Sequence, residues 1–293
     1  MYELIPVGER TYYIDCPAKI GVVRAGDDGV YLIDSGSDKD AAKKVRRVLE
    51  QNGWPLRGIL NTHSHADHIG GNRYLQDQTG CMVFSGGAEA DFIRHPILEP
   101  SFLYGGFPPD ELRHKFLLAQ ESTVTDFSDP AFPKDMEIIP LPGHSFDMVG
   151  FRTPDNVVFL ADSVNSPVTL EKYGVFFLHD VEAFLSTLDK VEQMTAALFV
   201  PSHAEPAGDC RELVRLNREK VQEIGDRIVS LCAEPCTAED LLAKLFAAYH
   251  LTMTFQQHAL VGSTLRSYLT WLKRNGRVTA QIQGNSLVWQ AVN

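Results

Sequence analysis

One short stretch constrains this chain more than any other: residues 61–71 read Asn-Thr-His-Ser-His-Ala-Asp-His-Ile-Gly-Gly. Four potential metal ligands, His63, His65, Asp67 and His68, fall within six residues. At an extended strand end, His63 and His65 point to the same side because strand side chains alternate. Asp67 and His68 lie beyond the bend and can face a second point nearby. The spacing therefore predicts a metal site in which one segment supplies parts of two adjacent positions.

Three further potential ligands, His144, Asp162 and His203, each follow a short apolar segment with the pattern of a strand. Such segments alternate in the first half of the chain with amphipathic, helix-like segments, for example residues 38–52 and 72–78. This alternation predicts an α/β architecture. Open sheets gather their sites at the carboxyl ends of their strands, so all of these residues are expected at one edge.

The candidate ligands share a preference for borderline and hard divalent metals. They are His63, His65, Asp67, His68, His144, Asp162 and His203. Imidazole and carboxylate groups suit Zn²⁺, Mn²⁺ or Fe²⁺, and the set contains no cysteine. Seven ligands are too many for one tetrahedral ion, but they suit two ions about 3.5–4 Å apart, bridged by a carboxylate and a water. We therefore expect two divalent metal ions, with zinc preferred to iron or manganese.

This arrangement resembles the metallo-β-lactamase superfamily, and the similarity covers the motifs within residues 34–203. That family has an αββα sandwich fold with the metal site at one edge of its two sheets. By this resemblance the ligands form two sets and a bridge: His63, His65 and His144 for the first metal, Asp67, His68 and His203 for the second, and Asp162 between them.

Residues present in the chain also distinguish subtypes of that family. Antibiotic-hydrolysing members generally lack the bridging aspartate, whereas Asp162 is present. The motif is similar to that of glyoxalase II, a thioester hydrolase, although the basic glutathione-binding tail has no evident counterpart here. Flavodiiron proteins replace the second histidine by glutamate, and tRNA-processing and β-CASP nucleases carry further motifs that we do not find. A mono-iron sulfur dioxygenase would use the same ligands, so oxidation stays open as a minor alternative.

The predicted site favours hydrolysis. A metal lowers the pKa of bound water from 15.7 to about 7, so a metal-bridging hydroxide is available at neutral pH to attack a carbonyl or phosphoryl centre. Asp67 can orient this hydroxide or take its proton. We expect a small ester, thioester or lactone as substrate. Two alternatives stay open: a phosphodiesterase or ribonuclease, and a ligand sensor whose tail reads DNA.

Composition excludes several other classes. The net charge of −11 argues against an extended nucleic-acid surface over the whole molecule. The five cysteines are scattered and show no zinc-ribbon spacing. Cys232 and Cys236, four residues apart, are expected to be buried free thiols. The N-terminal residues lack a secretory signal pattern, and no apolar run approaches the roughly 20 residues needed to span a bilayer. A soluble cytoplasmic protein without membrane contact is expected.

We expect residues 1–231 to form the catalytic domain, with a lid-like insert at 88–133, and residues 232–293 to form a small winged-helix-like domain. The insert is rich in proline, glycine and aromatic residues and lacks periodicity, so its aromatics either shape an apolar substrate pocket or seal a second small core. The tail reads as two helices, the first capped by Thr237, followed by a hairpin. Its mild basicity favours a structural or homodimerisation role over nucleic-acid binding.

The remaining candidates carry less weight. Asp34, after an early strand, either caps a turn or supports the metal loop from behind. The five other histidines match no motif and are expected at the surface or in the core, with the two in the insert as the first exceptions to consider: His95, His114, His179, His250 and His258.

Overall fold

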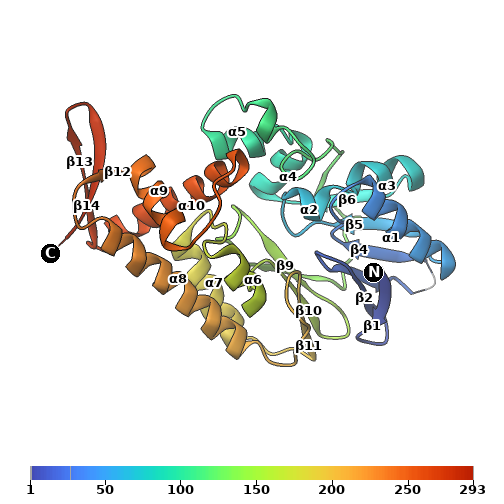
Figure 1. The fold of residues 1–293 in the computed structure, drawn as a ribbon. Helices are drawn as coiled ribbons and strands as arrows, with labels where there is room; N and C mark the ends of the chain where they lie inside the picture. The colour runs from blue at the N-terminus through green and yellow to red at the C-terminus, as the bar shows by residue number, and fades with distance from the viewer. Residues whose placement is uncertain (1, 27, 293) are drawn as a thin grey trace.

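The computed structural model describes residues 2–26 and 28–292; Met1, Asp27 and Asn293 lie outside the described residues. The strands are β1 Glu3–Pro6, β2 Thr11–Asp15, β3 Ile20–Arg24, β4 Val30–Ile33, β5 Leu56–Leu60, β6 Met82–Ser85, β7 Thr125–Asp126, β8 Glu137–Pro140, β9 Val149–Arg152, β10 Val157–Ala161, β11 Leu198–Pro201, β12 Cys236–Thr237, β13 Val278–Gln283 and β14 Ser286–Ala291. The helices are α1 Lys39–Gln51, α2 Ala66–Ile69, α3 Asn72–Thr79, α4 Gly87–Arg94, α5 Leu98–Tyr104, the 3-10 helix η1 Asp110–Leu112, α6 Pro167–Tyr173, α7 Val181–Gln193, α8 Arg211–Leu231, α9 Ala238–Ala248 and α10 Phe255–Arg274 (Figure 1).

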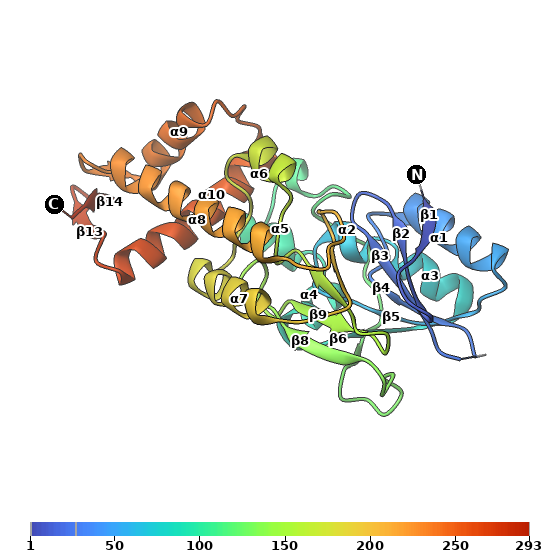
Figure 2. The same ribbon diagram turned by 90° about the horizontal axis from the view of Figure 1, so that it is seen from below.

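Two sheets organise the larger part of the chain. The first has seven strands in the order β1 to β7, antiparallel from β1 to β4 and parallel from β4 to β7. The second has the order β11-β10-β9-β8, with only the β10–β11 pair parallel. Figure 2 shows α1 and α3 on the outer side of the first sheet and α7 and α8 on the outer side of the second.

The layers follow from strand alternation, because successive side chains point to opposite faces. On β10, Val157 and Phe159 pack between the two sheets, whereas Val158 and Leu160 pack against the outer helices. On β4, Ile33 likewise faces the second sheet while its neighbours face α1. The order is helix, sheet, sheet, helix. The expected α/β architecture is confirmed.

Several elements were not expected from the sequence. The edge strand β1, the two-residue strand β7 and helix α6 were missed. Short edge pairings leave little hydrophobic pattern to detect. Within the described residues, no helix is both long and apolar enough to cross a membrane. All five cysteines are free and four of them are buried, which confirms the expectation for Cys232 and Cys236.

The residues from 232 onward pack onto the second sheet's helices. Leu245 of α9 and Leu269 of α10 belong to the same buried cluster as Phe184 of α7 and Val221 of α8. The expected cap of α9 is confirmed, with Thr237 and Asp240 forming a reciprocal capping box. The hairpin β13–β14 pairs with β12 into a third sheet. The boundary at residue 232 and the winged-helix comparison stay predictions.

The basic side chains of this C-terminal part are partly neutralised. Arg266 lies 3.6 Å from Glu239, and Arg277 lies 2.9 Å from Asp226. Arg274 similarly approaches an acidic residue of α7 at 3.5 Å. Surface pairs of this kind contribute little to stability, but they reduce the charge offered to a phosphate backbone.

The insert contributes to a second small core, but it also leaves some of its aromatic side chains exposed. Leu103 and Leu112 are buried in a small cluster with Ala259 of α10, so part of the insert does seal a second core. Phe107 and Phe116 are instead 77% and 64% exposed. The aromatics of this region therefore do not act as one set.

Candidate metal centre

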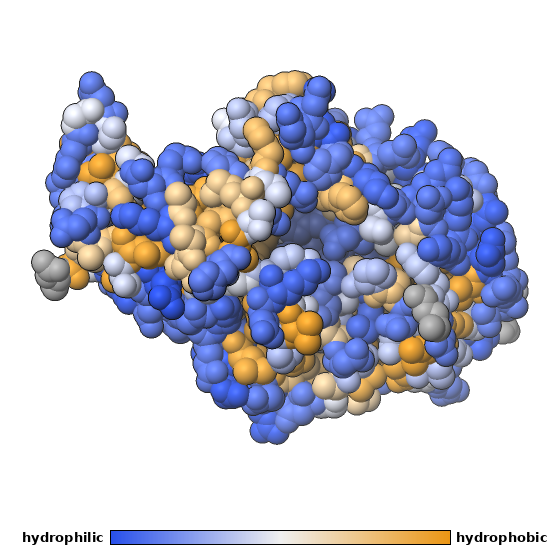
Figure 3. All heavy atoms as spheres, in the orientation of Figure 1, coloured by the Kyte–Doolittle hydropathy of each residue, from blue (hydrophilic) through white to orange (hydrophobic). Residues whose placement is uncertain are grey.

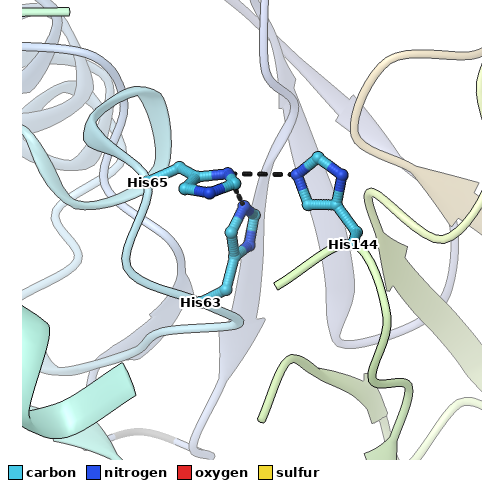
Figure 4. A group of neighbouring side chains, drawn as sticks. All are labelled: His63, His65 and His144. Carbon is cyan, nitrogen blue, oxygen red and sulfur yellow. Dashed lines mark hydrogen bonds between the residues drawn. The ribbon is translucent and has the colours of Figure 1, made fainter. Parts of the chain in front are cut away.

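Three histidine rings from two distant segments converge on one point; we call His63, His65 and His144 the first group. His63 Nε2 lies 3.1 Å from His65 Nδ1, and His144 Nε2 lies 3.0 Å from the same His65 nitrogen. The first two follow the end of β5, and His144 follows β8. Figure 4 shows the three rings turned toward a common centre. Three nitrogens so close together, two of them 79 residues apart in the chain, form the ligand geometry of a divalent ion.

A second group, Asp67, His68 and His203, forms beside the first. His203 Nε2 lies 3.4 Å from Asp67 Oδ2, and His68 Nε2 lies 3.7 Å from the same oxygen. The two histidines come from different sheets, since α2 follows β5 and His203 follows β11. One ligand atom from each member falls within 4.8 Å of the others. The structure thus brings all seven residues expected from the sequence to one sheet edge.

Asp162 lies between the two groups. Its Oδ2 atom is 3.5 Å from His144 Nε2 and 3.3 Å from His203 Nε2, and its Oδ1 atom is 3.3 Å from His68 Nε2. The preceding Ala161 has a φ of +50°, in the left-handed region that alanine rarely adopts. This turn directs the carboxylate into the centre as β10 ends.

Asp34 supports the centre from behind, which decides between the two roles considered for it. Its Oδ2 atom accepts a hydrogen bond from Thr62 Oγ1 at 2.8 Å and lies 2.8 Å from His68 Nδ1. Thr62 Oγ1 is in turn 3.0 Å from His63 Nδ1. One carboxylate therefore orients a histidine of each group, an arrangement that fixes ring tautomers in metal sites.

The first group is held in the neutral form that a metal ligand needs. Burial lowers the pKa of His63 well below its usual value, and it lowers the pKa of both His65 and His144 to about 4. Neutral imidazole offers a lone pair to a cation, whereas imidazolium does not. These three nitrogens are therefore available for coordination at neutral pH.

Carboxylates govern the rest of the centre. The charge of Asp162 raises the pKa of His203 to about 10 despite partial burial. Burial opposes the charged form of His68, but Asp162, Asp67 and Asp34 outweigh it and raise its pKa. Burial likewise opposes ionisation of Asp67, but the neighbouring His68 and His203 lower its pKa. The two aspartates of the centre thus carry negative charge, and the nearby His68 and His203 carry positive charge.

Two buried atoms of the centre, His68 Nε2 and Asp162 Oδ1, face each other at 3.3 Å. Neither has a hydrogen-bond partner within the described residues. Unpaired buried polar atoms are rare, and an ion between them would satisfy both. Together with the nitrogen and oxygen donor set, they fit divalent metals of the zinc, iron or manganese type.

The centre opens to solvent on one side. Figure 3 shows the molecule hollowed next to the position of α2, with a hydrophilic floor and hydrophobic side chains at its edge toward the C-terminal helices. Asp67 is 45% exposed, compared with 8% for Asp162. The ring of Phe177 lies 5.3 Å from that of His65 and 5.8 Å from that of His144. A substrate would meet an apolar ring beside the first group.

The histidines outside the motifs stay outside both groups. His95 is exposed and His114 is partly buried within the insert. His179 lies closest, because its backbone N–H donates to His144 O at 3.2 Å and its ring stacks on Phe146. Sequence patterns also missed Glu99, whose Oε1 atom is 3.6 Å from His65 Nε2, since a single glutamate in an aperiodic segment carries no signal.

Comparison with known proteins agrees with this geometry. The family model described as the metallo-beta-lactamase superfamily matches residues 13–203. That range contains all seven residues of the centre, and the chain belongs to this superfamily. A solved beta-lactamase domain protein from Burkholderia ambifaria superposes with a TM-score of 0.75 at 17% identity, covering 99% of this chain and 94% of that one. The shared fold therefore includes the C-terminal helices and hairpin.

Among curated proteins, a linear primary-alkylsulfatase from Pseudomonas sp. is 24% identical over 267 residues, covering 76% of this chain and 49% of the relative. A hydroxyacylglutathione hydrolase from Cereibacter sphaeroides is 34% identical over 171 residues, covering 58% of this chain and 56% of the relative. The chain thus spans about half the length of the curated relatives it matches. By their printed names, one relative is an alkylsulfatase and the other a hydrolase of hydroxyacylglutathione.

Proposed function

We propose that the chain hydrolyses a small ester, thioester or lactone with two divalent metal ions, and that zinc is the preferred metal. The position of Asp162 carries this proposal. One of its oxygens lies within 3.5 Å of a histidine from each group, so this carboxylate would help to hold both ions. His63, His65 and His144 would hold one ion, and the second group would hold the other.

When bound, the ions would activate water and polarise the electrophilic centre of the substrate as Lewis acids. The protein's own contribution is positional. The first group presents neutral nitrogens, and Asp34 fixes one ring of each group through hydrogen bonds of 2.8 Å to Thr62 and His68. Such fixed dipoles and charges require no reorganisation during the reaction.

Asp67 is the residue we assign a catalytic role. It is the most exposed carboxylate of the centre, so it can contact an entering water. Its neighbours His68 and His203 lower its pKa, which makes it a weak proton acceptor. We therefore assign it mainly to orienting the attacking water by accepting a hydrogen bond, with proton transfer as its secondary role.

Two observations support a carbonyl substrate. Phe177 places an apolar ring within 6 Å of the first group, where the acyl part of an ester or thioester would lie. The hydroxyacylglutathione hydrolase from Cereibacter sphaeroides, at 34% identity, acts by its name on a glutathione thioester. A glutathione-specific substrate is not part of the proposal, since the similarity covers 56% of that relative.

A panel of acyl thioesters, aryl esters and lactones, assayed with Zn²⁺-, Mn²⁺- and Fe²⁺-loaded protein, tests the proposal. We expect turnover of at least one thioester or ester, and a loss of at least 100-fold in His65→Ala and Asp162→Ala. His258→Ala, on the exposed face of α10, serves as the control and should retain activity. Hydrolysis of bis-aryl phosphodiesters alone would favour the phosphodiesterase alternative.

A further inference from the structure

Glu89, on α4 in the insert, is a buried carboxylate that the proposed reaction does not use. Only 1% of the residue is exposed. Its Oε2 atom accepts a hydrogen bond from Ser64 N at 2.8 Å, and its Oε1 atom accepts from Ser145 Oγ at 2.6 Å and from Asp147 N at 3.0 Å. Each oxygen of the carboxylate therefore accepts from a different loop.

These two loops are the ones that carry the first group. Ser64 lies between His63 and His65, and Ser145 directly follows His144. The loops are connected to different sheets, since β5 precedes one and β8 the other. Glu89 thus joins them through a third segment. Charge-assisted hydrogen bonds of this length are stronger than neutral ones.

The contact between α4 and the second loop is reciprocal. Asp147 Oδ2 accepts a hydrogen bond from Ala88 N at 2.8 Å, while Glu89 accepts from Asp147 N. Gly87, with a φ of +55°, allows this approach, because a Cβ at that position would lie 2.3 Å from Asp147 Oδ2. The start of α4 is therefore fitted to this loop.

In the part of the chain that the structure describes, two histidines of the first group, His65 and His144, have no hydrogen bond from the protein that fixes the outer ring nitrogen. His63 is backed by Thr62, but His144 Nδ1 is buried without a hydrogen-bond partner within the described residues. His65 Nε2 lies 3.6 Å from Glu99, beyond hydrogen-bonding distance. The positions of these two rings depend on their backbones, and both backbones are tied to Glu89.

We propose that Glu89 is a positioning residue that sets the spacing of the first group and thereby the metal affinity of that position only. The second group has its own supports, since His68 is backed by Asp34 and His203 Nδ1 lies 2.9 Å from Pro17 O. Loss of supports around metal ligands typically lowers metal affinity 10–100-fold. This inference rests on the two-metal site proposed above.

Stepwise Co²⁺ titration, followed by visible absorption of the metal-depleted protein, separates the two positions. His203→Ala leaves the first group complete, and His144→Ala leaves the second group complete. In the His203→Ala background, Glu89→Gln should weaken Co²⁺ binding at least tenfold and alter the absorption bands. The reason is that the amide nitrogen of glutamine cannot accept the hydrogen bond that one of the two loops donates. In the His144→Ala background the change should stay below threefold.

A matched control comes from Thr11, whose Oγ1 atom lies 2.9 Å from Thr153 Oγ1 and joins the two sheets at the end of β10 away from Asp162. Thr11→Val should lower thermal stability without changing either Co²⁺ affinity. If Glu89→Gln proves too unstable, Ser145→Ala, which removes one donor, should weaken the first position alone by a smaller factor.

Equal weakening of both positions, or no change at either, would overturn the role of Glu89 while leaving the metal site intact. Absence of Co²⁺ binding in the otherwise native protein would instead overturn the two-metal proposal, and the inference with it.

Discussion

Asp34 Oδ2 and His68 Nδ1 lie 2.8 Å apart, both almost fully buried. The same oxygen accepts a hydrogen bond from Thr62, which in turn contacts His63. Asp34 is thus connected to a histidine of each group. Its backbone φ of +64° at the end of β4 is part of the turn that allows these contacts.

Asp34→Asn should therefore lower the affinity of both metal positions by about 10–100-fold while the fold persists. The amide keeps the size of the side chain but replaces one acceptor by a donor facing His68 or Thr62. Competition with a chromophoric chelator measures the effect. Asp77→Asn, at an exposed pair with Arg73, is the control, and an equal loss there would contradict the assignment.

Substitutions of Asp162 and of His203 should differ in the number of bound metal ions that they affect. Asp162 contacts both groups, so Asp162→Asn should reduce binding at both positions, whereas His203→Ala should remove only the second ion. Elemental analysis after dialysis against a weak chelator gives the stoichiometry. Retention of both ions by Asp162→Asn would rule out its bridging position.

The metal-free protein should lose stability both when the pH is lowered and when it is raised from about 6.5. His65 and His144 have pKa values of about 4 in the folded chain, compared with 6.5 ordinarily, so the unfolded chain binds more protons between these values and stability falls as pH is lowered. His203 has a pKa of about 10, so the folded chain binds more protons between 6.5 and 10, and stability falls as pH rises.

The free energy of unfolding of the metal-free protein is therefore expected to be highest near pH 6.5, as measured by urea denaturation. His203→Gln should make the decline above that pH shallower, and His258→Gln should not. A steady rise in stability from pH 6.5 to 10 would contradict the charge arrangement of the centre.

Gly143 should tolerate no side chain. Its φ is +120°, and a Cβ there would lie 2.2 Å from the backbone nitrogen of Phe184. Gly143→Ala should lower the free energy of unfolding by about 2–4 kcal/mol and displace the adjacent His144. Gly208→Ala, where a Cβ meets nothing within 4 Å, should be nearly neutral. Similar stabilities of the two variants would refute this explanation.

The seven residues of the centre could be predicted because each belongs to a local pattern. Four lie in one segment, and His144, Asp162 and His203 each follow an apolar strand, so strand direction alone brings them to one edge. Glu89 could not be predicted. Its donors lie 25 to 58 residues away in the chain, and its own segment has no periodicity.

The same reasoning explains the elements that were missed. β7 has two residues, too few for an alternating pattern, and is fixed by its pairing with β6. The aromatic residues of the insert are alike in type, but some pack on a buried cluster and others are exposed to solvent. Their tertiary contacts decide which of them are buried. Strand periodicity predicted many of the strands and the family resemblance predicted two sheets, whereas the contacts between loops required the structure.

Calorimetric titration of the metal-depleted chain with Zn²⁺ tests the central claim most directly. The account predicts two ions bound per chain with dissociation constants below the micromolar range, falling to one in His203→Ala. A chain that binds no Zn²⁺, Fe²⁺ or Mn²⁺ at micromolar concentrations would contradict it.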